Sequence, residues 1–317
     1  VDVEVRARDV WTLTPGVSFG RAGGRNHTRF EFEELNLFGR GKQLAVAYST
    51  DPDRRTRQLR WRDPNVLGSR WTDELEIADS DDGHRRALVI ERPFFALATP
   101  WAAALAVSDE RREEDRYALG EAVDSYRVDR RFLDVYGGRS TGLVDGWVRR
   151  LGVGYRYDHS DFSRLPDTGA LDPPADRRLA YPYLRLELLE DGFEVSRNHD
   201  QIGRAEDLHL GRRLVAELGL VAPAFGADRT AAQIGLRASA GFHPAEDHTT
   251  LLALGLDGRL EGGGLRDALL SASARHYWRT SPRTLLFAGV SADVGHALDA
   301  DHTLLLGGDN GLRGFPL

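Results

Sequence analysis

Reactive residue types gather in a few short stretches of this sequence, and the first could contain a nucleophile. Residues 16–20 read GVSFG, which matches the G-x-S-x-G pattern of serine hydrolases. That chemistry requires Ser18 on a sharp turn from a strand to a helix, followed by an acid and a histidine. The following residues, RAGGRNHTRFEFEEL, are instead typical of a hairpin turn and a second strand. We therefore interpret Ser18 as a strand residue and predict no catalytic residue.

A second stretch could bind a metal ion. Residues 243–250, HPAEDHTT, contain His243, Glu246, Asp247 and His248. A zinc site needs ligands fixed on rigid elements, with a third or fourth group converging on the ion. These residues fall in a short loop between two strand-like runs. We therefore predict a solvated turn there, with no metal and no cofactor.

The third stretch is the tail LLLGGDNGLRGFPL, residues 304–317, in which glycines surround one arginine and one phenylalanine. A flexible linker is rich in small residues, but this tail also contains several leucines and Phe315. The role of Arg313 depends on the elements that precede it.

The composition excludes several classes of protein. The 317 residues include 42 Lys and Arg against 49 Asp and Glu, which gives a net charge of −7. The cations are scattered arginines, with Lys42 as the single lysine, so there is no basic patch for nucleic acid. Because Cys is absent, disulfides and thiolate metal sites are excluded. Met is also absent, so we expect a chain without its native start.

Alternation of apolar and polar residues is the strongest pattern in the chain. The even positions of residues 208–222 and 232–242 are mostly apolar, and most of the odd positions are polar or small. A soluble β-sandwich also alternates, but its strands average about five or six residues. Runs of ten to fifteen residues with one parity instead suit strands that span a bilayer. We therefore predict an all-β chain without a transmembrane helix, and favour a membrane β-barrel over a sandwich.

Tryptophans fall mostly at the ends of the strand-like runs. Core packing is one interpretation, and an aromatic girdle at a membrane interface is the other. The residues are Trp11, Trp61, Trp71, Trp101, Trp147 and Trp278.

Several motifs resemble one family, the outer-membrane assembly factors of the BamA/TamA type (bacterial surface antigen barrels). Residues 33–44, EELNLFGRGKQL, resemble the strand–turn–strand signature near the start of that barrel. Residues 61–71, WRDPNVLGSRW, and 91–101, ERPFFALATPW, resemble its Pro-aromatic periplasmic turns. The closing GGDNGLRGFPL resembles its [V/L]-R-G-F motif, at the tip of a long loop folded back into the lumen.

The resemblance implies a transmembrane antiparallel β-barrel of the outer-membrane type, with about 16 strands when complete. Residues 1–10 would be the end of a preceding POTRA-like module, and residues 11–317 the barrel up to its lumenal loop motif. In the family about four strands follow this loop, so we expect a C-terminally truncated chain. Alternation marks roughly fifteen runs before the motif, where the family has about eleven. Some runs are therefore expected to be loop ribbons or bent halves of one strand.

The implied function is assistance in the insertion and assembly of outer-membrane proteins, or secretion of a passenger, without enzymatic activity. The first strand, within residues 12–24, would pair weakly with the last and template client strands along its edge. An ordinary first strand with a hairpin turn is the other interpretation. The implied location is the outer membrane of a Gram-negative cell. The partners would be the lipid bilayer, unfolded client proteins and periplasmic accessory proteins.

The resemblance also assigns roles to single residues. Arg313 would be the lumenal anchor that bonds acidic residues of the inner wall, Gly314 would allow close backbone approach, and Phe315 would pack beside them. The other predicted residues are the motif's Leu312; the loop glycines Gly307, Gly308 and Gly311; the seam-strand residues Pro15, Gly16, Gly20, Gly23 and Gly24; and the signature turn Asn36, Leu37, Phe38, Gly39 and Gly41.

Two alternatives stay open. A passive pore or structural barrel would conduct ions steadily and would not depend on Arg313. A barrel that anchors an enzymatic domain, such as a lipase upstream of Val1, would carry its chemistry elsewhere.

Overall fold

The computed structural model describes residues 11–22, 25–50, 54–118, 121–166, 171–200, 203–281 and 283–304. Almost all of these residues lie in strands, joined by two short 3-10 helices, η1 (Val66–Gly68) and η2 (Pro223–Phe225). No helix among the described residues is long and apolar enough to cross a membrane. The strands are β1 (Leu13–Ala22), β2 (Arg25–Leu37), β3 (Lys42–Thr50), β4 (Arg55–Asp63), β5 (Thr72–Ser80), β6 (Gly83–Arg92), β7 (Trp101–Ala118), β8 (Glu121–Val144), β9 (Trp147–Arg164), β10 (Arg177–Glu190), β11 (Phe193–Arg197), β12 (Ala205–His209), β13 (Arg212–Val221), β14 (Ala231–Ala245), β15 (His248–Glu261), β16 (Gly264–Ser281) and β17 (Thr284–His296).

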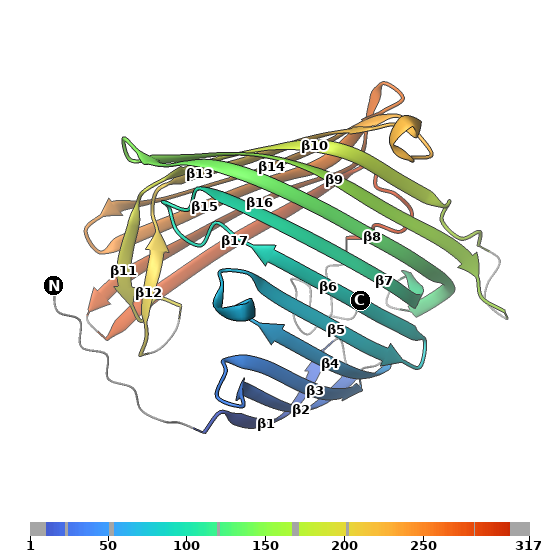
Figure 1. Ribbon diagram of the computed structural model, residues 1–317, viewed down its shortest axis with the longest axis horizontal. Helices are drawn as coiled ribbons and strands as arrows, with labels where there is room; N and C mark the ends of the chain where they lie inside the picture. Colours follow the sequence, from blue (N-terminus) through green and yellow to red (C-terminus); the bar gives the residue numbers. More distant parts are fainter. Residues whose placement is uncertain are drawn as a thin grey trace.

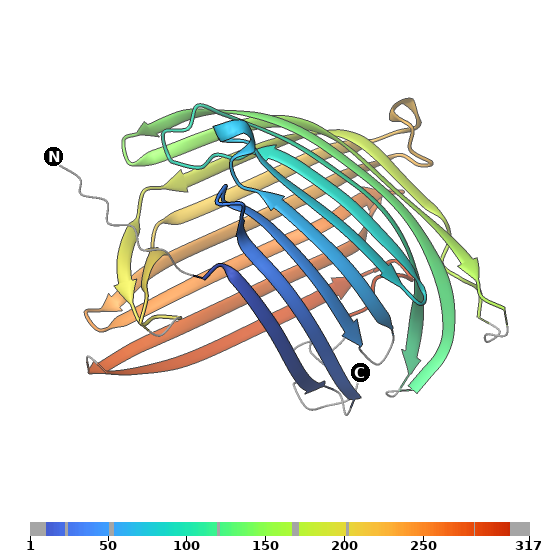
Figure 2. The ribbon, with the colours of Figure 1, turned by 60° about the horizontal axis from the view of Figure 1, so that its bottom comes forward.

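Fifteen of these strands form one antiparallel sheet in which each strand pairs with the next strand along the chain, except that β10 pairs with β13. The order runs from β1 to β10 and then from β13 to β17. The sheet curls around an interior, with β1 at one end of the strand order and β17 at the other (Figures 1 and 2). Among the described residues, β1 pairs only with β2 and β17 only with β16. The fold is therefore an all-β antiparallel barrel sheet of the outer-membrane type, as predicted, with two edges unpaired in the described chain.

β11 and β12 form a separate two-stranded ribbon between β10 and β13. Figure 1 shows the ribbon at the end of the sheet from which β1 starts. The expectation that some strand-like runs are loop ribbons therefore applies, among the described strands, to this pair alone. The sheet contains more strands before the closing motif than the eleven or so that the resemblance implies.

The ends of the strands form two rims of the sheet. We call the end at which β1 begins the near rim, and the opposite end the far rim. β1 and every second strand after it in the sheet order run from the near rim to the far rim, and the strands between them run back. All six tryptophans belong to the near rim, because each lies just before or at the start of a strand that leaves this rim, or near the end of a strand that returns to it. The tryptophans therefore form a one-sided girdle, which matches the interface interpretation.

The outer face of the sheet is apolar and exposed. In β9 the outward residues Leu151 and Val153 are each 59% exposed, and Leu184 of the neighbouring β10 is 57% exposed. Soluble monomers rarely leave continuous apolar surface of this kind in water. The sheet is therefore built to place this face in a nonpolar medium.

The height of this apolar belt can be measured along β9. Its outward residues from Trp147 at the near rim to Tyr157 are apolar or aromatic except for Arg149, and they become polar at His159 and Asp161. Ten residues of strand rise about 33 Å, and a tilt of about 40° reduces this to about 25 Å. That height equals the apolar band of outer-membrane barrels, with aromatic residues at both of its edges.

The inner face carries charged residues and tyrosines that cover glycines. Arg156 of β9 bonds Asp134 of β8 at 2.6 Å and Glu217 of β13 at 2.9 Å. Tyr183 donates to Asp134 at 2.7 Å, and its ring lies where a side chain at Gly154 would be. Glycine at this position leaves the room that the ring needs.

We expect Gly154→Ala to destabilise the sheet by about 1–3 kcal/mol, because a Cβ there would overlap the ring of Tyr183. Gly137→Ala is the matched control, since a Cβ at that glycine meets nothing within 4 Å. Urea unfolding of both variants in detergent, followed by tryptophan fluorescence, measures the difference. Equal stability of the two variants would contradict the close packing of Tyr183.

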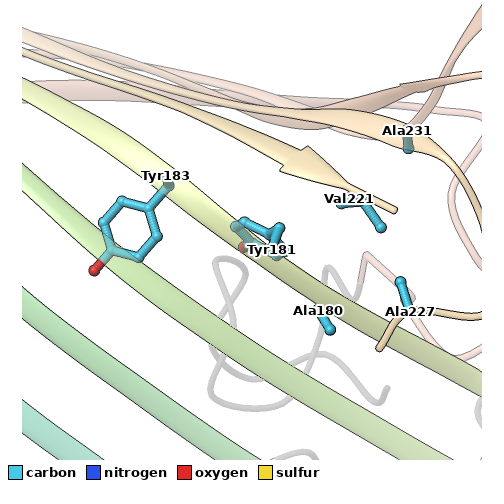
Figure 3. Close-up of a cluster of buried hydrophobic side chains, with 6 residues drawn as sticks. All are labelled: Ala180, Tyr181, Tyr183, Val221, Ala227 and Ala231. Carbon is cyan, nitrogen blue, oxygen red and sulfur yellow. The ribbon is translucent and has the colours of Figure 1, made fainter. Parts of the chain in front are cut away.

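At the far rim, the connection that contains η2 folds over β10. Figure 3 shows the buried cluster formed there by Ala180, Tyr181, Tyr183, Val221, Ala227 and Ala231. Ala180 and Val221 are completely buried, and the hydroxyl of Tyr155 donates to the carbonyl of Phe225 at 2.9 Å. This packing fixes the β10 end from which Arg177 projects.

Candidate functional site

A short segment after β17 enters the interior and forms the best-defined polar site of the described chain. We call residues 297–304 the strap. It is tied to β16 by two hydrogen bonds, in which the Asp267 N–H donates to the Ala297 carbonyl at 2.8 Å and the Asp299 N–H donates to the Asp267 carboxylate at 3.2 Å. The His302 ring also bonds Asp267, at 2.9 Å.

Two wall arginines clamp the acidic residues of the strap. Arg259 of β15 makes a bidentate contact with Asp299, at 2.7 and 2.8 Å. Arg177 of β10 donates to Asp299 at 2.7 Å and to both oxygens of Asp301 at 2.8 Å. Fork-to-fork contacts of this kind are short, strong and specific in geometry. The strap thus joins β10 and β15, which are three strands apart in the sheet order.

The clamp is shielded from solvent at its centre. Arg259 is only 3% exposed, and its Nε also donates to Glu261 at 2.7 Å. Burial alone would raise the pKa of Asp299, but the bond from Arg259 and the charge of Arg177 outweigh it and leave that pKa below its ordinary value. Asp299 is therefore a charged anchor at neutral pH.

We expect acid to release the strap. A carboxyl group with a depressed pKa in the folded state contributes stability above its ordinary pKa of about 3.9, and this contribution disappears as the pH falls further, through the folded value. Since the protein lacks cysteine, a spin label on Thr303→Cys reports the strap alone. Its mobility should rise below about pH 4. With Asp299→Asn the label should be mobile already at pH 7, and a label that is rigid there would contradict the clamp.

A cavity of about 430 Å³ lies beside the strap, and its lining contains more acidic than basic side chains. Asp82 of the β5–β6 turn lines this cavity, and one of its carboxylate oxygens is buried without a hydrogen bond. Its other oxygen lies 3.3 Å from Arg54. Burial raises the pKa of Asp82, and the charge of Arg54 only partly offsets this. The cavity therefore has an incompletely paired carboxyl group close to Thr303.

The free edge of β1 is the second candidate site. β1 pairs with β2 along its whole length, from Leu13 to Ala22. The Leu35 N–H donates to the carbonyl of Thr12 at 3.1 Å, so Thr12 belongs to a hydrogen-bonded pair. In an antiparallel ladder such pairs alternate with pairs whose N–H groups point away. Pro15 and Val17 consequently face the free edge, and Ser18 faces β2.

Pro15 therefore sits at a position where a strand tolerates proline, an unpaired edge. The predicted weak pairing of the first strand with the last stays a prediction; β1 pairs regularly with β2, and Pro15 leaves one donor missing from the other edge. Gly16 and Gly20 lie in this strand, and His27 of β2 covers Gly20. Gly23 and Gly24 lie outside the described residues.

The signature turn joins β2 to β3 at the near rim. The side chain of Asn36 accepts from the Gly41 N–H at 2.6 Å, and its carbonyl accepts from the Gly39 N–H at 2.8 Å. Phe38 and Gly39 have positive φ angles of 54° and 70°. Leu37 is the last residue of β2. The turn geometry accounts for the asparagine and the glycines of the motif.

The structure leaves one predicted group untested. Leu312, Arg313, Gly314 and Phe315, with the loop glycines Gly307, Gly308 and Gly311, lie outside the described residues. The same holds for residues 1–10, the predicted end of a preceding module. The strap leads directly toward the motif, since Leu304 is the last described residue.

Neither the serine-hydrolase motif nor the possible metal-binding stretch has a supporting arrangement of side chains among the described residues. Ser18 lies in the middle of β1 opposite Arg29, and a second strand follows it. His243 and His248 lie on β14 and β15 rather than in a loop, because the connection between these strands is only Glu246 and Asp247. The described residues contain no group of three or more His, Asp or Glu arranged to bind a metal.

Sequence reasoning missed the residues of the clamp. Arg177, Arg259, Asp299 and Asp301 belong to no motif, and only their spatial proximity marks them. One signal was present: residues 297–303, ALDADHT, place two aspartates just before the closing motif. The alternation of side chains was a second signal, because it places Arg259 on the same inner face of the sheet as Arg237 and Asp257.

No family model matches the chain, and no curated protein matches it. Among solved structures, its fold is similar to that of BamA from Haemophilus ducreyi lacking POTRA domains 1–3, with 13% sequence identity and a TM-score of 0.41. The match covers 90% of this chain and 57% of that chain. The chain therefore spans little more than half the length of that BamA structure. BamA is a member of the family that the sequence motifs resemble.

Proposed function

We propose that this chain is the barrel of an outer-membrane protein that assists the insertion and assembly of other outer-membrane proteins. The observation that carries the proposal is the free edge of β1 in a sheet whose outer face is apolar. The role requires no covalent step and no cofactor. Its partners are the outer-membrane bilayer, unfolded client barrels and periplasmic accessory proteins.

Membrane placement follows from the outer face. An apolar belt about 25 Å high, with tryptophans at the near rim and tyrosine at the other edge, fits an outer-membrane bilayer. Beyond the belt the outward pairs become charged, as in Arg111 with Asp129 at 2.6 Å. Such pairs suit a rim in water rather than in lipid.

Edge pairing supplies the mechanism. An unpaired strand offers N–H and C=O groups to which an incoming extended segment can add by β-augmentation. On β1 the donors beyond Pro15 include those of Val17 and Phe19. The missing donor at Pro15 weakens the pairing at the near rim, so that a client strand can be released after it has folded.

The strap and the closing motif form the second part of the proposal. Arg313 follows Leu304 by nine residues, which span at most about 30 Å, so it can reach the acidic cavity beside Thr303. We propose Asp82 as its partner, because this carboxyl group has an unsatisfied buried oxygen. The motif would then supply the arginine, and the wall of the barrel would supply the carboxylate. In the strap the charges are reversed, because there the wall supplies the arginines.

The experiment that tests the function uses the full-length protein in lipid vesicles. We expect it to accelerate the folding of a small reporter barrel, and Arg313→Ala and Asp82→Asn to reduce that acceleration without additivity. Additive effects would contradict the proposed pairing of Arg313 with Asp82 but would not contradict the proposed function.

No acceleration by a folded wild-type barrel would overturn the function itself. Steady ion conductance would then identify a passive pore. If the full-length protein instead hydrolysed lipid or ester substrates, the barrel would be an anchor for an upstream domain.

A further inference from the structure

A groove on the outer face lies near the tryptophan rim. Its volume is about 450 Å³, and its lining is mainly apolar. The floor is formed by Ala238 and Ala240 of β14, whose small side chains lie between rows of leucines on the neighbouring strands. Those leucines are Leu188, Leu214, Leu252 and Leu254. The groove is therefore a depression in the apolar outer face.

The near-rim end of the groove is cationic. Arg212 lines this end, its side chain is 70% exposed, and its guanidinium lies 5.3 Å from the centre of the Trp147 ring. Glu190 binds Arg212 through its Nε and one terminal nitrogen, at 2.9 and 3.2 Å. The second terminal nitrogen has no bond to a described residue and remains available to a ligand.

A second arginine lies on the same face, on β9, next to the groove-lining Leu188 of β10. Arg149 lies opposite Leu188 in the β9–β10 ladder and is exposed. Its guanidinium bonds no described residue, although its neighbour Arg150 on the inner face binds Glu187 at 3.2 Å. Arg149, Arg212 and Glu190 together carry one net positive charge.

The combination has the shape and charge of a lipid. An apolar trough accepts an acyl chain, a tryptophan marks the depth of the headgroup, and arginines bind phosphate through several donors at once. We propose that this groove is a binding site for an anionic phospholipid of the leaflet at the near rim. One acyl chain lies over Ala238 and Ala240, and the headgroup phosphate contacts Arg149 and Arg212.

The site is independent of client pairing, since it lies on β9, β10, β13, β14 and β15, whereas the free edge belongs to β1. It requires only that the outer face lies in a bilayer. The site could therefore exist in a passive pore, and a failure of insertase activity would not remove it.

The test is native mass spectrometry of the full-length protein in detergent, titrated with phosphatidylglycerol or phosphatidylcholine. We expect phosphatidylglycerol to bind more tightly. Arg149→Gln combined with Arg212→Gln should weaken its binding by about tenfold, through the loss of charge-assisted hydrogen bonds. Ala240→Trp should also weaken it, by filling the trough while leaving both arginines intact.

Two matched controls separate the site from general attraction. Arg131→Gln removes an exposed outward arginine at the far rim, and Ala232→Trp adds bulk at the far-rim end of β14. Neither should change phosphatidylglycerol binding. The proposal would be overturned if the wild type bound the two lipids with equal affinity. It would also be overturned if Arg131→Gln weakened phosphatidylglycerol binding as much as Arg149→Gln combined with Arg212→Gln.

Discussion

Arg259→Ala is expected to destabilise the barrel by about 1–3 kcal/mol and to loosen the strap from the wall. The substitution removes the bidentate partner of Asp299 and a short contact of Glu261, whose side chains are 20% and 27% exposed, and it leaves Asp299 with Arg177 alone. Loss of several charge-assisted hydrogen bonds around a buried guanidinium costs more than the loss of an exposed pair. The strap should then leave the interior, and ion conductance across a planar bilayer should rise.

The matched control is Arg237→Ala. Arg237 also faces the interior and binds Asp257 at 3.1 Å, but both side chains are about half exposed or more. Exposed pairs of this kind contribute about 0–1 kcal/mol, so this variant should unfold close to the wild type in urea. Arg259→Lys keeps the charge but not the fork, and should fall between the two. Equal losses for Arg259→Ala and Arg237→Ala would contradict a buried clamp.

Val17→Pro should reduce the acceleration of client folding by about two- to tenfold, the value of one hydrogen bond, while leaving the barrel folded. The Val17 N–H points to the free edge of β1, so its removal breaks no bond to β2. Pro15→Val is the opposite change, because it adds a donor to the same edge. It should strengthen client pairing and slow client release. Single-turnover and multiple-turnover folding assays of a reporter barrel separate these two steps.

Ser18→Pro is the control for a general effect of proline. Its N–H faces β2, so the same substitution one residue along removes a bond of the ladder and should destabilise the sheet. A folded Val17→Pro barrel with full activity would remove the β1 edge from the mechanism. A Val17→Pro barrel that unfolds as readily as Ser18→Pro would show that the edge is already paired within the protein.

The long strands and their faces could be predicted from the sequence because side chains alternate with a period of two. In β14 the residues of the apolar outer face, such as Ile234 and Leu236, and the polar inner residues Gln233 and Arg237 follow from parity alone. The same rule predicted the all-β class, which is confirmed, and placed the tryptophans at strand ends. That all six tryptophans lie at the same rim follows only from the direction in which each strand crosses the sheet.

The strap shows what periodicity could not predict. Arg177 and Asp299 are 122 residues apart, and no local pattern relates them. Their contact depends on the curvature of the sheet, which brings β10 and β15 to a common interior, and on the direction in which the chain turns after β17. The seam strand gives a second case, since composition suggested weak pairing at Pro15, whereas only the ladder shows which edge lacks the donor.

The sequence by itself therefore determined the strand class, the two faces and the turn chemistry at Asn36 and Gly39, because these depend on neighbours within a few residues. Only the tertiary structure decided which charges meet in the interior, which N–H groups of β1 remain free, and where the small residues Ala238 and Ala240 leave a groove among leucines. Each of these features depends on strand register and sheet curvature, which are set by contacts far apart in the chain.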